Sequence, residues 1–124
     1  MIVGIGVDVV DLARFERAAA RTPALVARLF AESERATPER RLSLRSLAGR
    51  FAAKEALIKA IGDSTGVRWH DMRVVSDEHG NPAFELDGGV ADIARARGIS
   101  AIHLSMSHDA GVAIAWVVVE KNDS

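Results

Sequence analysis

The chain has 124 residues, of which 48% are hydrophobic and 27% are charged, and its formal net charge is −1. This composition is typical of one globular domain and excludes a global charge that attracts nucleic acid or an anionic membrane. The chain has no cysteine, which excludes disulfides, thiolate catalysis and zinc–cysteine sites. Its longest apolar run, Val112–Val119, is too short to span a bilayer, and Asp8 makes the N-terminus a poor signal peptide. We expect one cytoplasmic domain over residues 1–124.

The first apolar segment, Ile2–Val10, predicts a buried β-strand because it is rich in β-branched residues. Gly4 and Gly6 within it leave room for another backbone to approach closely. Asp11 follows the strand and is a suitable N-cap for a predicted helix over Leu12–Arg21.

That first predicted helix has apolar and basic residues on opposite faces. Its basic face could receive an acidic partner, although charged helix faces are usually just solvated. The basic residues are Arg14, Arg17 and Arg21. Thr22 and Pro23 then predict the N-cap and first residue of a further helix, which ends at about Phe30.

A long helical pattern runs from Thr37-Pro38 to Ile61, with Gly62 as its C-terminal stop. Gly49 lies inside this segment, so its first part could be a separate element. Because burying a carboxylate is costly unless it meets a cation or a metal, Glu55 is a candidate functional residue. Steps of three and four residues place it on a face that we expect to point into the core, with Leu44, Leu47, Phe51 and Ile58.

The second half of the chain predicts four strands and one short helix. The last strand is nearly all apolar, so we expect it to be buried on both faces or to lie in a subunit contact. The predicted elements are strands over Met72–Ser76 and Ala83–Leu86 around a turn at Asp77–Pro82, a helix around Val90–Ala94 closed by Gly98, and strands over Ile99–Met106 and Gly111–Glu120 around a polar turn at Ser107–Gly111.

Asp8 and Glu55 are acidic residues in apolar surroundings. If the first strand packs on the central helix, the two carboxylates could converge, and such a pair suits Mg²⁺. The alternative is structural: Glu55 pairs with Lys59 one turn along the helix, and Asp8 is capped by backbone. Lys59 could contact a phosphate beside such a metal, whereas Arg50, Lys54 and Lys59 could equally form a solvated face.

The segment SMSHDAG at Ser105–Gly111 places Ser, His and Asp together, which invites comparison with a hydrolase. That interpretation is weak, because adjacent residues do not generally form one proton relay and no nucleophile-elbow sequence is present. A hydroxyl and an imidazole that contact a phosphate are one alternative. A turn-capping role for Asp109 is the other.

Three segments together resemble the 4′-phosphopantetheinyl transferases: GIGVD at Gly4–Asp8, RFAAKEALIKA at Arg50–Ala60 and SMSHDAG at Ser105–Gly111. The resemblance is to the short, stand-alone holo-acyl-carrier-protein synthases and covers essentially the whole chain. It implies an α+β fold in which an antiparallel sheet packs against a long central helix. It also implies transfer of the 4′-phosphopantetheine arm of coenzyme A to a serine of apo acyl carrier protein, with release of adenosine 3′,5′-bisphosphate.

The resemblance also implies roles for single residues. Asp8 and Glu55 match the carboxylates that bind Mg²⁺, with Mn²⁺ as a possible substitute, and Lys59 matches a lysine that contacts a phosphate of coenzyme A. The helix with Arg14 and Arg21 resembles the surface that docks the acidic carrier protein. Further residues fall in segments that line the coenzyme site in similar proteins: Arg50, Lys54, Gly80, Pro82, Ser107 and His108.

Short members of the family form homotrimers with the site between subunits, so the resemblance implies this assembly as well. Longer members have a third acidic ligand where this chain has Val10. The metal would then have two protein ligands. Three candidates stay open for the base that deprotonates the serine: a metal-bound water, Glu55, and the His108–Asp109 pair.

Two other functions remain open from the sequence. The first is a coenzyme- or nucleotide-binding module without catalysis, which could dispense with the metal carboxylates Asp8 and Glu55. The second is a magnesium-dependent pyrophosphatase, which would attack with water and would need no basic docking helix.

Overall fold

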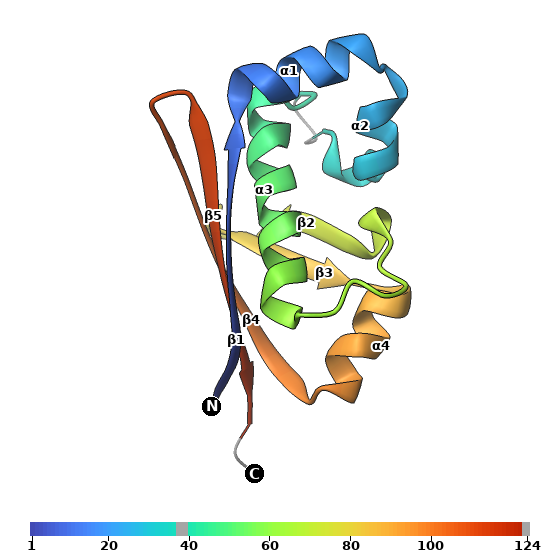
Figure 1. The fold of residues 1–124 in the computed structure, drawn as a ribbon, viewed down its shortest axis with the longest axis vertical. Helices are drawn as coiled ribbons and strands as arrows, with labels where there is room; N and C mark the ends of the chain where they lie inside the picture. Colours follow the sequence, from blue (N-terminus) through green and yellow to red (C-terminus); the bar gives the residue numbers. More distant parts are fainter. Residues whose placement is uncertain (37–39, 123–124) are drawn as a thin grey trace.

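The computed structural model describes residues 1–36 and 40–122. A three-stranded antiparallel sheet, in the order β1-β5-β4, lies along one side of the long helix α3, Leu44–Ile61 (Figure 1). The strands of this sheet are β1 (Ile2–Asp11), β4 (Ile99–Asp109) and β5 (Val112–Lys121). This arrangement confirms the predicted α+β fold, with an antiparallel sheet packed against a long central helix.

The remaining elements surround α3 on the sides that the sheet leaves free. Helices α1 and α2 lie at one end of the molecule, α4 lies at the other, and the β2–β3 hairpin lies between them (Figure 1). Their bounds are α1 Leu12–Arg21, α2 Ala24–Leu29, β2 Met72–Ser76, β3 Pro82–Leu86 and α4 Gly88–Ala96, with short 3₁₀ turns η1 at Glu32–Glu34 and η2 at Trp69–Asp71. None of the helices in the described ranges is long and apolar enough to cross a membrane.

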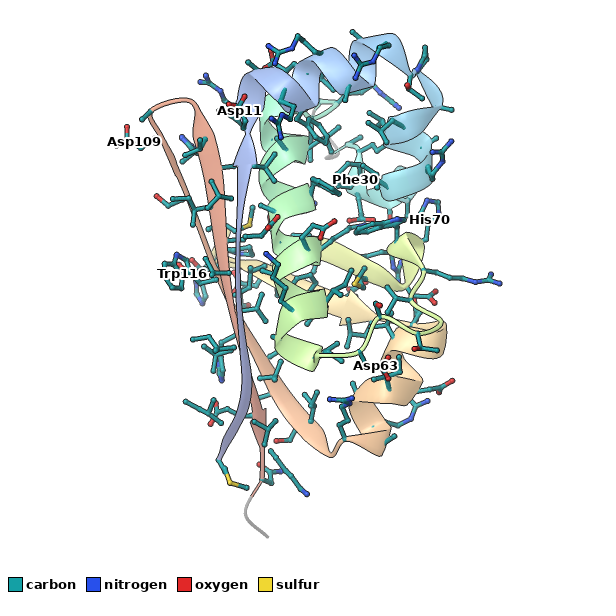
Figure 2. All side chains as sticks on the ribbon, in the orientation of Figure 1. Asp11, Phe30, Asp63, His70, Asp109 and Trp116 are labelled. Atoms are coloured by element: carbon teal, nitrogen blue, oxygen red, sulfur yellow. The ribbon has the colours of Figure 1, made fainter. Side chains whose placement is uncertain are left out.

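The sheet buries one face against α3 and leaves its other face open. Successive side chains of a strand point to opposite faces, so the residues of β1 alternate between the helix and the exterior. The prediction that Ile2–Val10 is a buried strand is therefore wrong for the single chain, in which Ile5 is 64% exposed. For β5, the first of the two predicted alternatives, burial on both faces, is also wrong for the single chain: Trp116 is 52% exposed and lies on the side of the sheet away from α3 (Figure 2).

Helix α3 begins later than the sequence pattern predicts. The predicted start at Thr37-Pro38 falls on residues 37–39, which lie outside the described residues. Residues 40–43 are described and are not helical. Ser43 caps the helix, because its side-chain oxygen accepts a hydrogen bond from the backbone N–H of Ser46 at 3.1 Å. At the other end Gly62 adopts φ +79°, the left-handed conformation of a C-terminal stop, as predicted.

Two other boundaries differ from the prediction. Thr22 ends α1 instead of capping α2, which begins at Ala24. Strand β4 continues through Asp109, so Ser107 and His108 are strand residues and the turn is reduced to Ala110 and Gly111. Both turn residues have positive φ, as a two-residue β-hairpin requires.

Candidate functional site

Strand β1 lies directly on α3 because two glycines leave room for the helix backbone. A Cβ atom added at Gly4 would lie 2.0 Å from the carbonyl oxygen of Ala60, and one added at Gly6 would lie 1.9 Å from that of Ala56. This confirms the close approach that the glycines predict. Because residues two apart on a strand share a face, Asp8 also points toward α3.

Asp8 contacts one side chain of α3, that of Lys59, and interacts electrostatically with a second, that of Glu55. The Nζ of Lys59 donates to Oδ1 of Asp8 at 2.9 Å and to the carbonyl oxygen of Val7 at 3.1 Å. Burial raises the pKa of Glu55, and the charge of Asp8 raises it further, while Lys59 lowers it. The structure thus brings Asp8, Glu55 and Lys59 together, and Lys59 pairs with Asp8 rather than with Glu55 as the structural alternative required.

The two carboxylates fit the predicted divalent cation. Neighbouring carboxylates disfavour ionisation of one another, so the charge of Asp8 adds to the effect of burial in raising the pKa of Glu55. A divalent cation would relieve this repulsion. Their oxygens are the ligands that Mg²⁺ and Mn²⁺ prefer. In residues 1–36 and 40–122, no group of three or more His, Asp or Glu side chains is placed to hold a metal. Asp8 and Glu55 are the two side chains of this chain that would hold such an ion.

A second cluster lies near the N-terminal turns of α3, in a pocket of about 350 Å³ that we call the basic pocket. Four residues predicted for the coenzyme site line it: Arg50, Pro82, Ser107 and His108. Sequence reasoning missed Arg45, which also lines it. Guanidinium groups are suited to bind phosphate, so the basic pocket can accept a phosphorylated ligand.

Besides Lys59, which contacts Asp8, two residues predicted for the coenzyme site do not line the basic pocket. Gly80 lies in the turn between β2 and β3, where its φ is +81°. Lys54 is fully buried, and its Nζ donates to Oε1 of Glu34 at 2.8 Å. Burial lowers the pKa of Lys54, while the hydrogen bond to Glu34 raises it. Sequence reasoning missed Glu34 because it lies in a polar stretch with no helical or strand pattern.

A third feature, which we call the apolar pocket, lies beside Asp8 and also has a volume of about 350 Å³. Helices α1, α2 and α3 line it mainly with apolar side chains, namely Phe15, Ala18, Leu25, Leu29 and Phe51. Arg14 lines it as well, whereas Arg21 is exposed at the end of α1 and outside the lining. We call the site of Asp8 and Glu55 the carboxylate site. The apolar pocket therefore connects the predicted docking helix, α1, to Asp8 of this site.

Comparison with known proteins agrees with this architecture. The family model of the 4′-phosphopantetheinyl transferase superfamily matches residues 4–117. A holo-[acyl-carrier-protein] synthase of Clavibacter michiganensis is 64% identical over 120 residues, which cover 97% of each chain. The crystal structure of the holo-[acyl-carrier-protein] synthase from Neisseria meningitidis matches 98% of this chain and 100% of its own, with a TM-score of 0.86 and 35% identity.

A second solved structure was determined with a ligand. The holo-[acyl-carrier-protein] synthase of Helicobacter pylori, in complex with coenzyme A, matches 94% of this chain and 99% of its own, with a TM-score of 0.81 and 31% identity. The family match spans nearly the whole chain, and the relatives and this protein have similar lengths. The chain belongs to the 4′-phosphopantetheinyl transferase superfamily.

Proposed function

We propose that the protein is a holo-acyl-carrier-protein synthase, which transfers the 4′-phosphopantetheine arm of coenzyme A to a serine of apo acyl carrier protein. Adenosine 3′,5′-bisphosphate is the second product. The observation that carries the proposal is the meeting of Asp8, Glu55 and Lys59 in one site. The names of the relatives, and the coenzyme A complex of the Helicobacter pylori protein, support the assignment of substrates.

The reaction breaks the pyrophosphate of coenzyme A, so charge accumulates on the leaving phosphate. Asp8 and Glu55 would hold Mg²⁺, or Mn²⁺ in its place, which supplies positive charge to the pyrophosphate oxygens when bound. Lys59 would add a positive charge beside the leaving phosphate. To do so, its ammonium group must release Asp8 and contact the phosphate instead. Positioning and electrostatic stabilisation are the main catalytic contributions in phosphoryl transfer.

One coenzyme molecule must reach both the carboxylates and the basic pocket, and these lie on different sides of α3. Arg50 and Glu55 are five residues apart, or about 140° around the helix. Asp8 belongs to β1 and His108 to β4, which are the two edges of the three-stranded sheet. We therefore infer that a complete site combines the β1 edge of one copy with the β4 edge of another.

The open face of the sheet is suited to such an assembly. It exposes a row of large apolar side chains, which a soluble protein seldom leaves uncovered, namely Val3, Ile5, Val7, Val9 and Trp116. A homotrimer in which these faces meet would cover them, and it is the assembly that the resemblance implies.

Weakening this contact should make activity depend on protein concentration. Replacement of Trp116 by alanine is expected to leave the fold intact, because the side chain is 52% exposed in one chain, but to promote dissociation on dilution. Specific activity and sedimentation velocity should both fall as the variant is diluted. Trp116→Phe keeps an aromatic side chain and is the matched control. If Trp116→Ala stays fully active and assembled at every dilution, the contact does not involve this face.

The carrier protein is the proposed partner of α1. Exchange of Arg14 or Arg21 for glutamate should raise the KM for the acidic carrier protein about tenfold or more, while the KM for coenzyme A changes little. The wild-type KM should also rise with salt, because attraction between exposed charges is screened over about 8–10 Å. Arg95→Glu, on α4 at the far end of the molecule (Figure 1), makes the same charge change as a control. A carrier-protein KM that does not respond to salt would rule out this docking surface.

His108 is expected to bind coenzyme A rather than to deprotonate the serine. It lines the basic pocket with Arg45 and Arg50, whose guanidinium groups are suited to bind phosphate. His108→Ala should therefore raise the KM for coenzyme A and change kcat by less than about threefold, since a residue that binds substrate and transition state equally affects KM alone. A kcat lower by two orders of magnitude would restore His108 as a candidate base. The other candidate base from this chain is Glu55.

The overall function is tested by weighing the carrier protein. Incubation with Mg²⁺, coenzyme A and an apo carrier protein should add one phosphopantetheine, a gain of about 340 Da, as expected for this class of transfer. A pyrophosphatase would cleave coenzyme A without changing the mass of the carrier. A binding module would neither cleave coenzyme A nor change the mass of the carrier. Cytoplasmic location remains a prediction.

A further inference from the structure

The most deeply buried ionisable groups lie outside the site described above. Lys54 and Glu34 form an ion pair in which both side chains are 0% exposed. Buried charges are costly unless they are paired and fully hydrogen-bonded. Neither Lys54 nor Glu34 contacts the carboxylate site, so the reaction gives no direct reason for this pair.

All three donors of the Lys54 ammonium group are used within the chain. Its Nζ donates to the carbonyl oxygen of Leu29 at 2.7 Å, to Oε1 of Glu34 at 2.8 Å and to the carbonyl oxygen of Trp69 at 3.0 Å. The Nζ also lies 4.9 Å from the centre of the Phe30 ring, which Figure 2 shows between α2 and α3. Lys54 therefore has no donor left for a phosphate.

Glu34 extends the network to β2. Its Oε1 also accepts from the backbone N–H of Ala31 at 3.0 Å, and its Oε2 accepts from the backbone N–H of Val74 at 3.0 Å. The carboxylate thus holds the strand at Val74, a residue that lines the basic pocket.

Val74 connects this network to Arg50. While its N–H binds Glu34, its carbonyl oxygen accepts from Nη1 of Arg50. Arg50 lies one helical turn before Lys54. Burial lowers the pKa of Arg50, while the charge of Glu34 raises it. The guanidinium is therefore held in the basic pocket by a carbonyl that Glu34 fixes and by the charge of Glu34 itself.

We propose that Glu34, paired with Lys54, is a positioning residue that holds Arg50 in the basic pocket to bind coenzyme A. The proposal rests on the proposed function for the identity of the ligand. The Lys54 ammonium provides the counter-charge that allows a carboxylate to remain ionised in the core beside the pocket. Glu34 acts through Arg50 and does not touch the substrate.

The test is a double-mutant cycle on the KM for coenzyme A. Glu34→Gln should raise this KM about tenfold and leave the KM for the carrier protein unchanged. Arg50→Ala should raise it as well, and adding Glu34→Gln to Arg50→Ala should raise it less than about twofold further, because residues that act through one another are not additive. Glu32→Gln, in the same 3₁₀ turn with its side chain 68% exposed, should leave both KM values unchanged. Additive effects would overturn the proposal.

Two further measurements separate positioning from simple stabilisation. Loss of stability lowers the active fraction, and hence the apparent kcat, without raising a KM. If Glu34→Gln does not fold, the variant Glu34→Gln/Lys54→Met removes both charges and leaves no unpaired one. This variant should also bind coenzyme A more weakly, and wild-type affinity would contradict the proposal. Calorimetric titration with adenosine 3′,5′-bisphosphate measures the affinity of the basic pocket without turnover. It therefore tests the role of Glu34 even if no phosphopantetheine transfer is found.

Discussion

Replacement of Glu55 by glutamine is expected to lower kcat/KM for phosphopantetheine transfer by about a thousandfold or more, while the metal-free protein becomes more stable. The loss follows because an amide replaces a charged ligand of the metal that offsets charge in the transition state. The gain in stability follows because burial and the charge of Asp8 both raise the pKa of Glu55. Ionised Glu55 therefore destabilises the metal-free fold at neutral pH, and glutamine removes that charge.

The stabilisation should depend on pH in a defined direction. The pKa of Glu55 is higher in the folded than in the unfolded chain, so its contribution to stability is fully present below the unfolded value and is lost as pH rises through the folded value. The Tm of Glu55→Gln should exceed that of the wild type at pH 7, and the difference should vanish on acidification to about pH 4, near the ordinary glutamate pKa. Differential scanning calorimetry without metal measures this. Equal Tm values at pH 7 would contradict the described environment of Glu55.

Replacement of Gly6 by alanine is expected to destabilise the fold by about 3 kcal/mol, at the upper end of the usual range for overpacking. The added Cβ would lie 1.9 Å from the carbonyl oxygen of Ala56, and a helix backbone cannot move aside as a side chain can. Strand β1 must then separate from α3, which moves Asp8 away from Glu55, so activity should fall as well. Urea denaturation and the transfer assay measure the two effects.

Gly49 is the matched control for this prediction, because it lies in α3, the helix against which Gly6 packs. Its added Cβ would lie 3.1 Å from Cε of Met106, the flexible end of a side chain. Alanine is favoured over glycine within helices by about 1 kcal/mol, so Gly49→Ala should leave stability unchanged or slightly higher. If Gly6→Ala were as stable as Gly49→Ala, direct contact between β1 and α3 would be ruled out.

The sequence predicts most elements of this fold because their signals are local. Strand β2 matches the predicted Met72–Ser76, and α1 matches the predicted Leu12–Arg21. The meeting of β1 with α3 was also predictable, because Gly4 and Gly6 indicate a close backbone approach. The convergence of Asp8 with Glu55 follows from that packing.

Other features depend on packing that no local pattern reveals. The predicted buried face of α3 included Phe51 and Ile58, which are half-buried, whereas the fully buried positions are largely small residues such as Ala52, Ala53 and Ala56. Small side chains are what the close approach of β1 requires. The burial of Lys54 could not be predicted, because its partner Glu34 lies in an irregular segment that reaches α3 only in the folded chain.

The most direct test of the site is the binding of Mn²⁺, followed by electron paramagnetic resonance, to the wild type and to the variants Asp8→Asn and Glu55→Gln in the presence of coenzyme A. Coenzyme A alone provides the background, because its phosphates also bind the ion. We expect one Mn²⁺ per chain in the wild type, with binding that weakens as pH falls through the raised pKa of Glu55. Either substitution should reduce binding to the background of coenzyme A. Unchanged binding in both variants would show that Asp8 and Glu55 do not form the metal site.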